Sequence, residues 1–257
     1  MKKIKTVILC GGIGYRLKEE TEFKPKPMVE VGGKPILWHI MKIYSHFGFN
    51  DFIIALGYKG NLIKDYFVNN KYYDGDFTLN TKSHKIVHYP KDHNNQFRIT
   101  FVDTGLESLT GERVKRIKKY INEENFMVTY GDGLANIDLL KLFKFHKKQN
   151  TLATVTGVLP NLRFGGFEKG QKGLAENFTK RAKIRQFING GFMVFKKGVF
   201  NFIKNDSMIE DVFDTLINQR QLSLFEHKGF FHAMDTYQDM QDLNNLWREK
   251  PAWKIWA

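Results

Sequence analysis

The sequence lacks several features that would place it in other protein classes. It has one cysteine in 257 residues, Cys10, which excludes an internal disulfide framework and suits a reducing cytoplasm. No apolar run approaches the roughly 18 residues that a membrane-spanning helix needs. The short apolar stretch near the start is followed at once by glycines and charges, unlike a signal peptide. We therefore expect a cytoplasmic protein with no membrane partner, in which Cys10 is a small core residue.

Two common phosphate-binding motifs are missing as well. A Walker A loop needs Gly, four residues and Gly-Lys-Ser/Thr, and the sequence does not contain it. A dinucleotide fingerprint, G-x-G-x-x-G, would start at Gly12, but Leu17 stands at its third glycine position. Two prolines then follow where the fingerprint needs a helix, and proline breaks helices. The first glycine-rich turn of this chain therefore belongs to neither class.

Negative charge is scarce. The chain has 40 Lys and Arg against 27 Asp and Glu, a net charge of +13. Such a balance is typical of proteins that bind nucleic acids, anionic membranes or phosphorylated small molecules, although a solvated, lysine-rich surface is a simpler explanation. The most basic segment, GERVKRIKKY at 111–120, has helical spacing and no interleaved aromatic residues that could stack on bases. We therefore expect no nucleic-acid partner.

Apolar runs and helical periodicity alternate in the first half of the chain. Residues 4–9 and 51–56 are predicted strands, and residues 35–47 and 60–68 are predicted helices. This alternation predicts βαβ units, with a mostly parallel sheet and helices on both faces. Residues 72–96 are predicted to form loop and an edge hairpin. Further strands are expected at 98–103, 126–133, 151–158, 190–195 and within 222–236, and further helices at 110–121, 138–148, 197–204, 209–219 and near the end. The fold class is therefore α/β, with one domain and an elaborated second half.

The segment VILCGGIGYRLKEETEFKPKPMV carries the most distinctive pattern. Gly11, Gly12 and Gly14 directly follow a predicted strand, and glycine lets backbone N–H groups approach a phosphate without obstruction by Cβ. Arg16 and Lys26 flank this loop, and an arginine fork with a lysine can neutralise a triphosphate. A plain tight turn is the alternative for the glycines alone, and the two cations weaken it.

Two aspartates follow predicted strands. Asp132 stands between two glycines after residues 126–130, and Asp235 follows an apolar strand late in the chain. Ligands of open α/β sheets bind at the carboxyl ends of the strands. A few carboxylates together with substrate phosphates are the ligands that Mg²⁺ prefers. The pattern therefore predicts a Mg²⁺ site at Asp132 and Asp235, with a turn aspartate as the alternative for Asp132.

Together these residues resemble the sugar nucleotidyltransferases, or nucleotide-sugar pyrophosphorylases, and within them the glucose-1-phosphate cytidylyltransferase branch. The likeness covers nearly the whole chain and includes the glycine loop, KPKPM, GGKPILWHIMKIY, DFIIALGYKG, VDTG, LTGERVKR, TYGDG, INGGF, FEHKGFFHAMDT and AWKIW. It implies a Rossmann-like fold in a single nucleotidyltransferase domain at 1–257. Residues 1–150 would be its nucleotide-binding half, and 151–257 its acceptor-binding half with the C-terminal helices.

The resemblance also implies a chemistry and a site. A phosphorylated acceptor would attack the α-phosphate of a nucleoside triphosphate, and pyrophosphate would leave. Arg16 and Lys26 would be catalytic, and Asp132 and Asp235 would bind Mg²⁺. The implied nucleotide-binding residues are Gly11, Gly12, Gly14, Thr110, Arg113 and Gly131. Thr110 and Arg113 fall where the cytidylyl branch contacts its nucleotide, which indicates CTP. The implied acceptor-binding residues are Gly165, Lys180, Arg181 and Asn189. Because relatives are oligomeric, we expect a homo-oligomer.

One family motif is missing. The family has a Glu-Lys-Pro motif before the NGG strand, whose glutamate binds sugar hydroxyls and whose lysine binds the sugar phosphate. Here the stretch is ENFTKRAKIRQFINGG, in which Phe178 matches the family but the glutamate and proline are absent. Glu176 is nearby but out of register, and Lys180 or Arg181 can still supply a cation.

Drift in a variable loop and a changed acceptor both explain this loss. We favour an acceptor other than a hexose, with L-glutamine phosphate, converted to CDP-L-glutamine for capsule modification, as the candidate and glucose 1-phosphate as the alternative. An alternative of another class is a catalytically silent, nucleotide-binding regulatory subunit. The presence of Arg16, Lys26, Asp132 and Asp235 argues against it.

Overall fold

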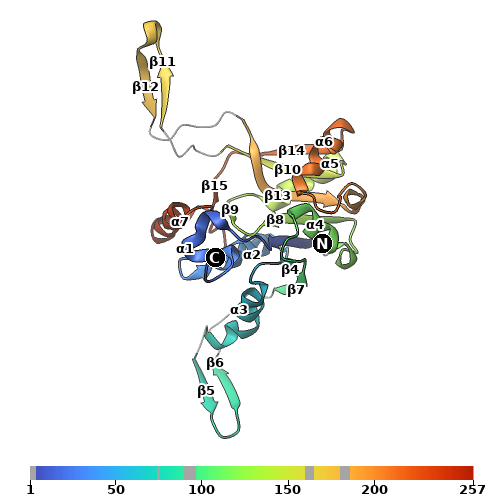
Figure 1. The fold of residues 1–257 in the computed structure, drawn as a ribbon, viewed down its shortest axis with the longest axis vertical. Helices are drawn as coiled ribbons and strands as arrows, with labels where there is room; N and C mark the ends of the chain where they lie inside the picture. Colours follow the sequence, from blue (N-terminus) through green and yellow to red (C-terminus); the bar gives the residue numbers. More distant parts are fainter. Residues whose placement is uncertain (1–3, 74–75, 90–96, 160–164, 180–185, 257) are drawn as a thin grey trace.

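The computed structural model describes residues 4–73, 76–89, 97–159, 165–179 and 186–256 (Figure 1). Its centre is a seven-stranded sheet with the order β14-β10-β13-β8-β1-β4-β7. The strands are β1 (Lys5–Cys10), β4 (Asp51–Leu56), β7 (Arg98–Asp103), β8 (Asn125–Tyr130), β10 (Ala153–Val158), β13 (Ile188–Lys196) and β14 (Leu222–His227). Only β13 is antiparallel to its neighbours in this sheet. The predicted mixed, mostly parallel sheet is confirmed, and strands from both halves of the chain form it.

Alternating side chains of the strands enter two hydrophobic cores, one on each face of the sheet. On β1, Ile8 packs in the core that α2 (Ile36–His46) and α5 (Leu139–Gln149) cover. Val7 and Leu9 pack in the other core, against α4 (Thr110–Arg116) and α6 (Phe213–Asn218). A strand that is buried on both faces is a nearly continuous apolar run, which is why these strands can be recognised in the sequence. Helices therefore cover both faces, as predicted.

Several helix boundaries differ from the prediction. The helix expected at 60–68 is longer, as α3 (Gly60–Tyr73), and the one expected at 110–121 ends at Arg116 and continues as a 3-10 turn, η3 (Lys118–Tyr120). The segments after β13 are mainly 3-10 turns, η5 (Lys197–Asn201) and η6 (Ile209–Val212), with α6 after them. Local backbone hydrogen bonding decides such ends, and periodicity does not report it.

The elements around the first glycine loop are short. They are η1 (Tyr15–Leu17), α1 (Lys18–Thr21), η2 (Lys26–Met28), β2 (Glu30–Val31) and β3 (Lys34–Pro35). The C-terminal helix α7 (Tyr237–Glu249) begins with a capping box between Thr236 and Asp239. Behind it, Trp253 is fully buried and donates to His39, whose pKa burial lowers to about 4. The tail is therefore part of the core.

A short ladder joins distant parts of the chain near the sheet. Strand β9 (Gly133–Ala135) pairs with β15 (Phe231–Ala233), and Met234 N donates to Asp132 O at 2.9 Å. This pairing brings the segment before Asp235 alongside the turn at Asp132. Two positions that are 103 residues apart in sequence, 235 − 132, are thereby fixed next to each other.

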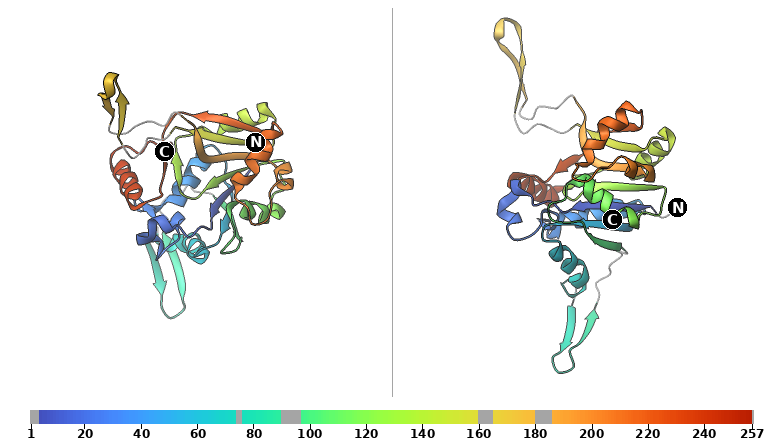
Figure 2. Two further views of the ribbon diagram at one scale, coloured as in Figure 1. Left: turned by 45° about the horizontal axis from the view of Figure 1, so that its top comes forward. Right: turned by 45° about the vertical axis from the view of Figure 1, so that its right-hand side comes forward.

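Two hairpins project from the body on opposite sides (Figures 1 and 2). One is β5 (Asp76–Asn80) with β6 (Lys85–Tyr89), and the other is β11 (Gly166–Lys169) with β12 (Ala175–Thr179), joined through η4 (Gln171–Gly173). We name them the first arm and the second arm. The hairpin expected at the edge of the sheet is wrong in its placement, because β5 and β6 pair only with each other. Within the described ranges, no helix is long and apolar enough to cross a membrane.

Candidate active site

A cavity of about 330 Å³ opens at the carboxyl ends of β1 and β8. These two strands are neighbours in the sheet, so the loops that follow them meet. The cavity is lined by Leu9, Cys10, Gly11, Gly12, Gly14, Arg16, Lys26, Pro27, Ser108, Leu109, Thr110, Arg113, Tyr130, Gly131, Asp132 and Met208. It therefore lies at the predicted edge of the sheet and brings together all the residues predicted to be catalytic or to bind nucleotide.

The charged centre of this cavity is Lys26. Its Nζ lies 2.7 Å from Asp132 Oδ2 and 2.7 Å from Asp235 Oδ1, and Arg16 Nη2 lies 2.9 Å from the same Asp235 oxygen. Burial lowers the pKa of Lys26, but the two carboxylates outweigh burial and raise the pKa above its usual value. Lys26 is therefore a fixed positive charge at neutral pH, where a triphosphate would need one.

Asp132 and Asp235 are the described residues that fit a divalent metal best. Each uses one oxygen in the contact with Lys26, and the other oxygen of each has no hydrogen-bond partner among the described residues. The described part of the chain contains no cluster of three or more His, Cys, Asp or Glu side chains that could bind a metal. A pair of carboxylates that leaves further positions to phosphates is what Mg²⁺ accepts, so the residues fit this ion.

The three glycines of the first loop have different surroundings. A Cβ at Gly11 would lie 2.2 Å from Arg113 Cζ, so Gly11 makes room for protein atoms. A Cβ at Gly12 would have nothing within 4 Å, and Gly14 has φ +74°, the left-handed region that favours glycine. Gly12 therefore leaves the backbone open toward the cavity, Gly14 supplies a left-handed turn close to Thr21 and Lys26, and Gly11 allows a close packing contact.

Arg113 is 3% exposed and is surrounded by oxygens of the protein itself. Its Nη1 donates to Leu56 O at 3.1 Å, Thr104 Oγ1 at 2.8 Å and Gly105 O at 2.6 Å. Its Nη2 donates to Gly11 O at 3.1 Å and Leu106 O at 3.0 Å. The guanidinium group therefore joins the glycine loop to the loops that follow β4 and β7.

Thr110, three residues before Arg113 on α4, also holds neighbouring segments together. Its Oγ1 accepts a hydrogen bond from Ile209 N at 2.9 Å, and Gly111 N donates to Ser207 O at 2.9 Å. A Cβ at Gly111 would lie 2.7 Å from Ser207 O, so only glycine permits this approach. The start of α4 therefore holds residues 207–209 against the cavity.

Sequence reasoning missed a polar cluster at the end of β8. Tyr130 Oη donates to Glu210 Oε1, and Asn189 Nδ2 donates to the same oxygen at 3.3 Å. Burial, and after it the contact with Glu210, raises the pKa of Tyr130, so its hydroxyl keeps its proton. Tyr130 stands directly before the Gly-Asp-Gly turn, a position that could have drawn attention to it. Glu210 lies in η6, within the segment predicted only as a helix, and has no such signal.

The four predicted acceptor-binding residues lie in different parts of the chain. Asn189 lies at the start of β13 beside the cavity, where its Oδ1 accepts from Gly191 N at 2.9 Å. Gly165 is exposed and directly precedes the second arm. Lys180 and Arg181 lie outside the described residues. Of the two described residues, neither lines the cavity, and Asn189 is joined to the lining residue Tyr130 through Glu210. Cys10, also as expected, is buried, and burial raises the pKa of its thiol.

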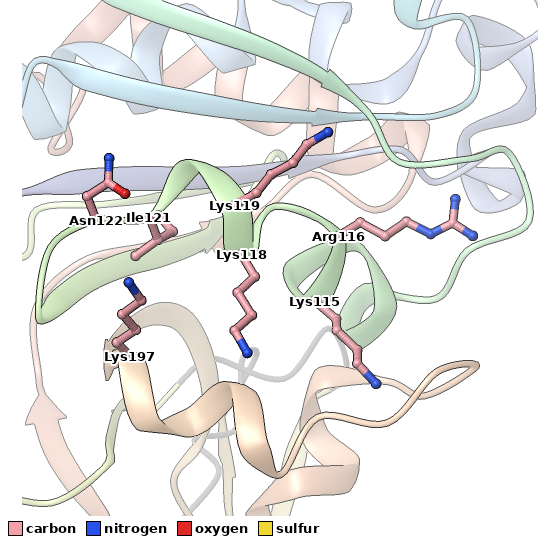
Figure 3. A pocket seen from close by; sticks show the side chains of 7 residues that line it. All are labelled: Lys115, Arg116, Lys118, Lys119, Ile121, Asn122 and Lys197. Carbon is pink, nitrogen blue, oxygen red and sulfur yellow. The ribbon is translucent and has the colours of Figure 1, made fainter.

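A second, larger hollow of about 460 Å³ lies at the opposite end of the sheet (Figure 3). It is lined by Lys115, Arg116, Lys118, Lys119, Ile121, Asn122 and Lys197. Lys118 points toward the short helix that begins at Lys197, whereas Arg116 and Lys119 point away from it (Figure 3). None of these lining residues is a carboxylate or a glycine, so this hollow lacks the groups that make the first cavity a candidate for catalysis.

Comparison with protein families identifies the chain. The family described as nucleotidyl transferase matches residues 5–254. The chain belongs to the nucleotidyl transferase family. A glucose-1-phosphate cytidylyltransferase of Salmonella typhi is 44% identical over 259 residues, and a probable glucose-1-phosphate cytidylyltransferase of Bacillus subtilis is 40% identical over 257 residues. Each alignment covers 98% of this chain and 100% of the relative.

The solved structures agree in fold. HddC from Yersinia pseudotuberculosis superposes with a TM-score of 0.67 at 22% identity, covering 95% of this chain and 99% of that one. Identity at this level shows the fold alone. The resemblance stated from the sequence is thus confirmed: this nucleotidyltransferase is an enzyme with a Rossmann-like sheet, and glucose-1-phosphate cytidylyltransferases are among its full-length relatives.

Proposed function

We propose that this nucleotidyltransferase is a Mg²⁺-dependent cytidylyltransferase that transfers CMP from CTP to glucose 1-phosphate and releases pyrophosphate. The observation that carries the proposal is the contact of Lys26 with Asp132 and Asp235 beside an open glycine loop. The names of two relatives aligned over 98% of this chain support both the nucleotide and the acceptor.

The residues of the cavity suit an in-line displacement. An oxygen of the acceptor's phosphate forms a bond to the α-phosphorus, and the bond from that phosphorus to the bridging oxygen of the β-phosphate breaks. Lys26 and Arg16 neutralise the charge that develops on the phosphates, which is the main requirement of phosphoryl-type transfer. Mg²⁺ bound by Asp132 and Asp235 would supply further neutralisation of the phosphates. No covalent intermediate is needed, and the buried Cys10 is unsuited to form one.

We propose different tasks for the predicted nucleotide-binding residues. The amide at Gly12 faces the triphosphate, because its surroundings leave the backbone open, and Gly14 supplies the left-handed turn that shapes the loop. Gly131 brings the turn after β8 close to β1, since a Cβ there would lie 2.9 Å from Leu9 O. Thr110 and Arg113 act from the cavity wall, where their hydrogen bonds to protein atoms fix the shape that would fit a cytosine.

The acceptor is the point on which the sequence and the relatives differ. The missing Glu-Lys-Pro motif favoured L-glutamine phosphate, whereas the relatives' names favour glucose 1-phosphate, the alternative stated above. We adopt glucose 1-phosphate and keep the amino-acid phosphate as a second candidate that rests on the missing motif alone. In either case we propose that residues 1–150 bind the nucleotide and that 151–257 supply most contacts to the acceptor.

A homo-oligomer is part of the proposal. The two arms expose large apolar side chains on isolated two-stranded ribbons, and such ribbons have little stability alone in water. These side chains are Phe77, Leu79, Ile86, Val87, Tyr89, Phe167, Leu174 and Phe178. Burial against other copies of the chain would stabilise them. Light scattering coupled to size-exclusion chromatography tests this, and a monomer at micromolar concentration would contradict it.

The decisive experiment is an acceptor panel. The protein is mixed with CTP, Mg²⁺ and inorganic pyrophosphatase, and phosphate release is measured with glucose 1-phosphate, other hexose 1-phosphates and L-glutamine phosphate. We expect glucose 1-phosphate to give the highest kcat/KM. A preference for L-glutamine phosphate would establish the second candidate. If no acceptor led to phosphate release, the protein would instead be a nucleotide-binding regulatory subunit.

The metal assignment has its own test. Asp235→Asn removes one of the two proposed carboxylate ligands, so half-maximal activity should require a Mg²⁺ concentration roughly tenfold or more above that of the wild type. Asp214→Asn, at an exposed position of α6, is the matched control. An unchanged Mg²⁺ titration for Asp235→Asn would count against metal binding by this residue.

A further inference from the structure

Glu210 holds an unusual position for a carboxylate. One oxygen, Oε1, accepts hydrogen bonds from Tyr130 Oη and Asn189 Nδ2. The other oxygen, Oε2, is buried and has no hydrogen-bond partner among the described residues. A buried polar atom without a partner costs stability, so such an atom calls for an explanation other than folding.

The surroundings connect this carboxylate with the cavity. Tyr130 lines the cavity two residues before Asp132, and its ring leaves no space for a side chain at Gly191, where a Cβ would lie 2.6 Å from Tyr130 Cδ2. Met208, two residues before Glu210, lines the same cavity. Glu210 is therefore held behind the cavity wall, on the side of Asn189, the second residue of β13.

We infer that Glu210 is a specificity-determining residue for the acceptor: its free oxygen, Oε2, accepts a hydrogen bond from a hydroxyl group of the phosphorylated acceptor. This inference rests on the proposed function. Tyr130 and Asn189, which hold the other oxygen, are only half-buried. This cluster must rearrange when the acceptor binds, so that Oε2 comes within reach of the hydroxyl group. An oxygen already removed from water accepts such a bond without further loss of hydration.

The inference also accounts for the missing motif. The Glu-Lys-Pro glutamate that binds sugar hydroxyls in the family is absent here, and Glu176, the nearest carboxylate in sequence, is exposed on the second arm. Glu210 is a carboxylate supplied from a different segment at the same edge of the sheet. A chain that has lost the first group can then still recognise a polyhydroxylated acceptor.

The test uses Glu210→Gln, which keeps an oxygen for Tyr130 and Asn189 but puts an amide nitrogen in place of the free oxygen. We expect KM for glucose 1-phosphate to rise roughly 10- to 100-fold, the range of a lost hydrogen bond to a charged group. KM for CTP should stay within about twofold. Glu176→Gln is the matched control and should leave both KM values unchanged.

Monodeoxy analogues of glucose 1-phosphate distinguish two roles of Glu210: a hydrogen bond to an acceptor hydroxyl, and support of the cavity wall alone. At one ring position, loss of the hydroxyl should lower kcat/KM of the wild type roughly tenfold or more, but that of Glu210→Gln by less than about twofold, because the partner is already gone. Equal losses in both proteins at every position would overturn the inference. If Glu210→Gln raised KM for CTP as much as KM for glucose 1-phosphate, the inference would be overturned as well.

Different results would contradict the proposed function and the inference about Glu210. If the wild type does not use glucose 1-phosphate, the proposed acceptor is wrong, and Glu210→Gln is compared with the wild type on the best acceptor of the panel. An unchanged KM for that acceptor would then overturn the inference. A thermal midpoint of Glu210→Gln equal to or above that of the wild type shows that the kinetic effect is not unfolding.

Discussion

The central sheet and the two arms are built from strands of similar length but differ in what holds them. Every residue of β10 is buried, whereas every residue of β12 is exposed. β10 pairs with two neighbours and is covered by helices, but β12 pairs with β11 alone. The residues at the sheet's edge are consequently fixed by register and packing, as the contact of Lys26 with Asp132 and Asp235 illustrates.

The proposed site residues are also distributed between the central sheet and the arms. The residues proposed to bind triphosphate and metal lie at the carboxyl edge of the sheet, and the ladder of β9 and β15 holds Asp235 beside Asp132 there. Gly165, by contrast, lies at the base of the second arm. We therefore expect substitutions at the sheet's edge to act on turnover in an isolated chain, and substitutions on the arms to act mainly on assembly.

The largest effect should come from Lys26. Lys26→Met removes the ammonium group that contacts both aspartates, and we expect kcat to fall by about 10³-fold, as for loss of a preorganised charge at a reacting centre. Lys82→Met, at the exposed turn of the first arm, is the matched control and should keep full activity. Steady-state kinetics with CTP and glucose 1-phosphate decide this. Turnover of Lys26→Met within tenfold of the wild type would remove Lys26 from the mechanism.

Core and arm phenylalanines should differ almost as strongly in stability. Phe126 is fully buried and stacks on Phe200, with 5.1 Å between the two ring centroids. Phe126→Ala should therefore lower the free energy of unfolding by about 3–5 kcal/mol. Phe167 is 73% exposed, and Phe167→Ala should cost less than about 1 kcal/mol in a monomer. Urea denaturation measures both. Equal losses would mean that the second arm is packed in solution, for example against another subunit, and light scattering would then show whether Phe167→Ala dissociates it.

The sequence predicts the buried strands of the central sheet better than the exposed strands of the arms. The bounds of β1, β4, β7 and β10 lie within about two residues of the prediction. β1, β4 and β10 are almost completely buried, and such strands are nearly continuous apolar runs, whereas the edge strand β7 is recognised by its central residues 99–102. The second arm was not predicted, since a ribbon exposed on both faces has no burial pattern to detect. The glycines, Lys26 and the aspartates could be identified from spacing at strand ends. Glu210 could not, because its role depends on a contact with Tyr130 across 80 residues.

Arg113 should give the next largest effect. Arg113→Lys keeps the charge but loses the fork that reaches Gly11 O and Leu106 O together, so the glycine loop loses its support. We expect kcat/KM for CTP to fall roughly 100-fold, with most of the loss in KM. Arg98→Lys, a largely exposed arginine beside Asp51 at the other edge of the sheet, is the control. A loss confined to KM of the acceptor would contradict the assignment of Arg113 to the nucleotide side.

The smallest effect concerns acid stability, and it compares a histidine of the body with one of the first arm. His146 is buried between Thr154 and Asn125, and burial lowers its pKa to about 4, below the usual value of 6.5 in the unfolded chain. The unfolded state therefore binds a proton first as the pH falls, and the free energy of unfolding should decline between about pH 6.5 and pH 4. His146→Gln should reduce this decline by on the order of 1–3 kcal/mol, measured by urea denaturation at pH 7 and pH 4.5. His84→Gln, at the turn of the exposed first arm, should leave the decline unchanged. If both variants kept the wild-type pH dependence, the acid sensitivity would have to come from other buried groups, such as His39 beneath the C-terminal tail.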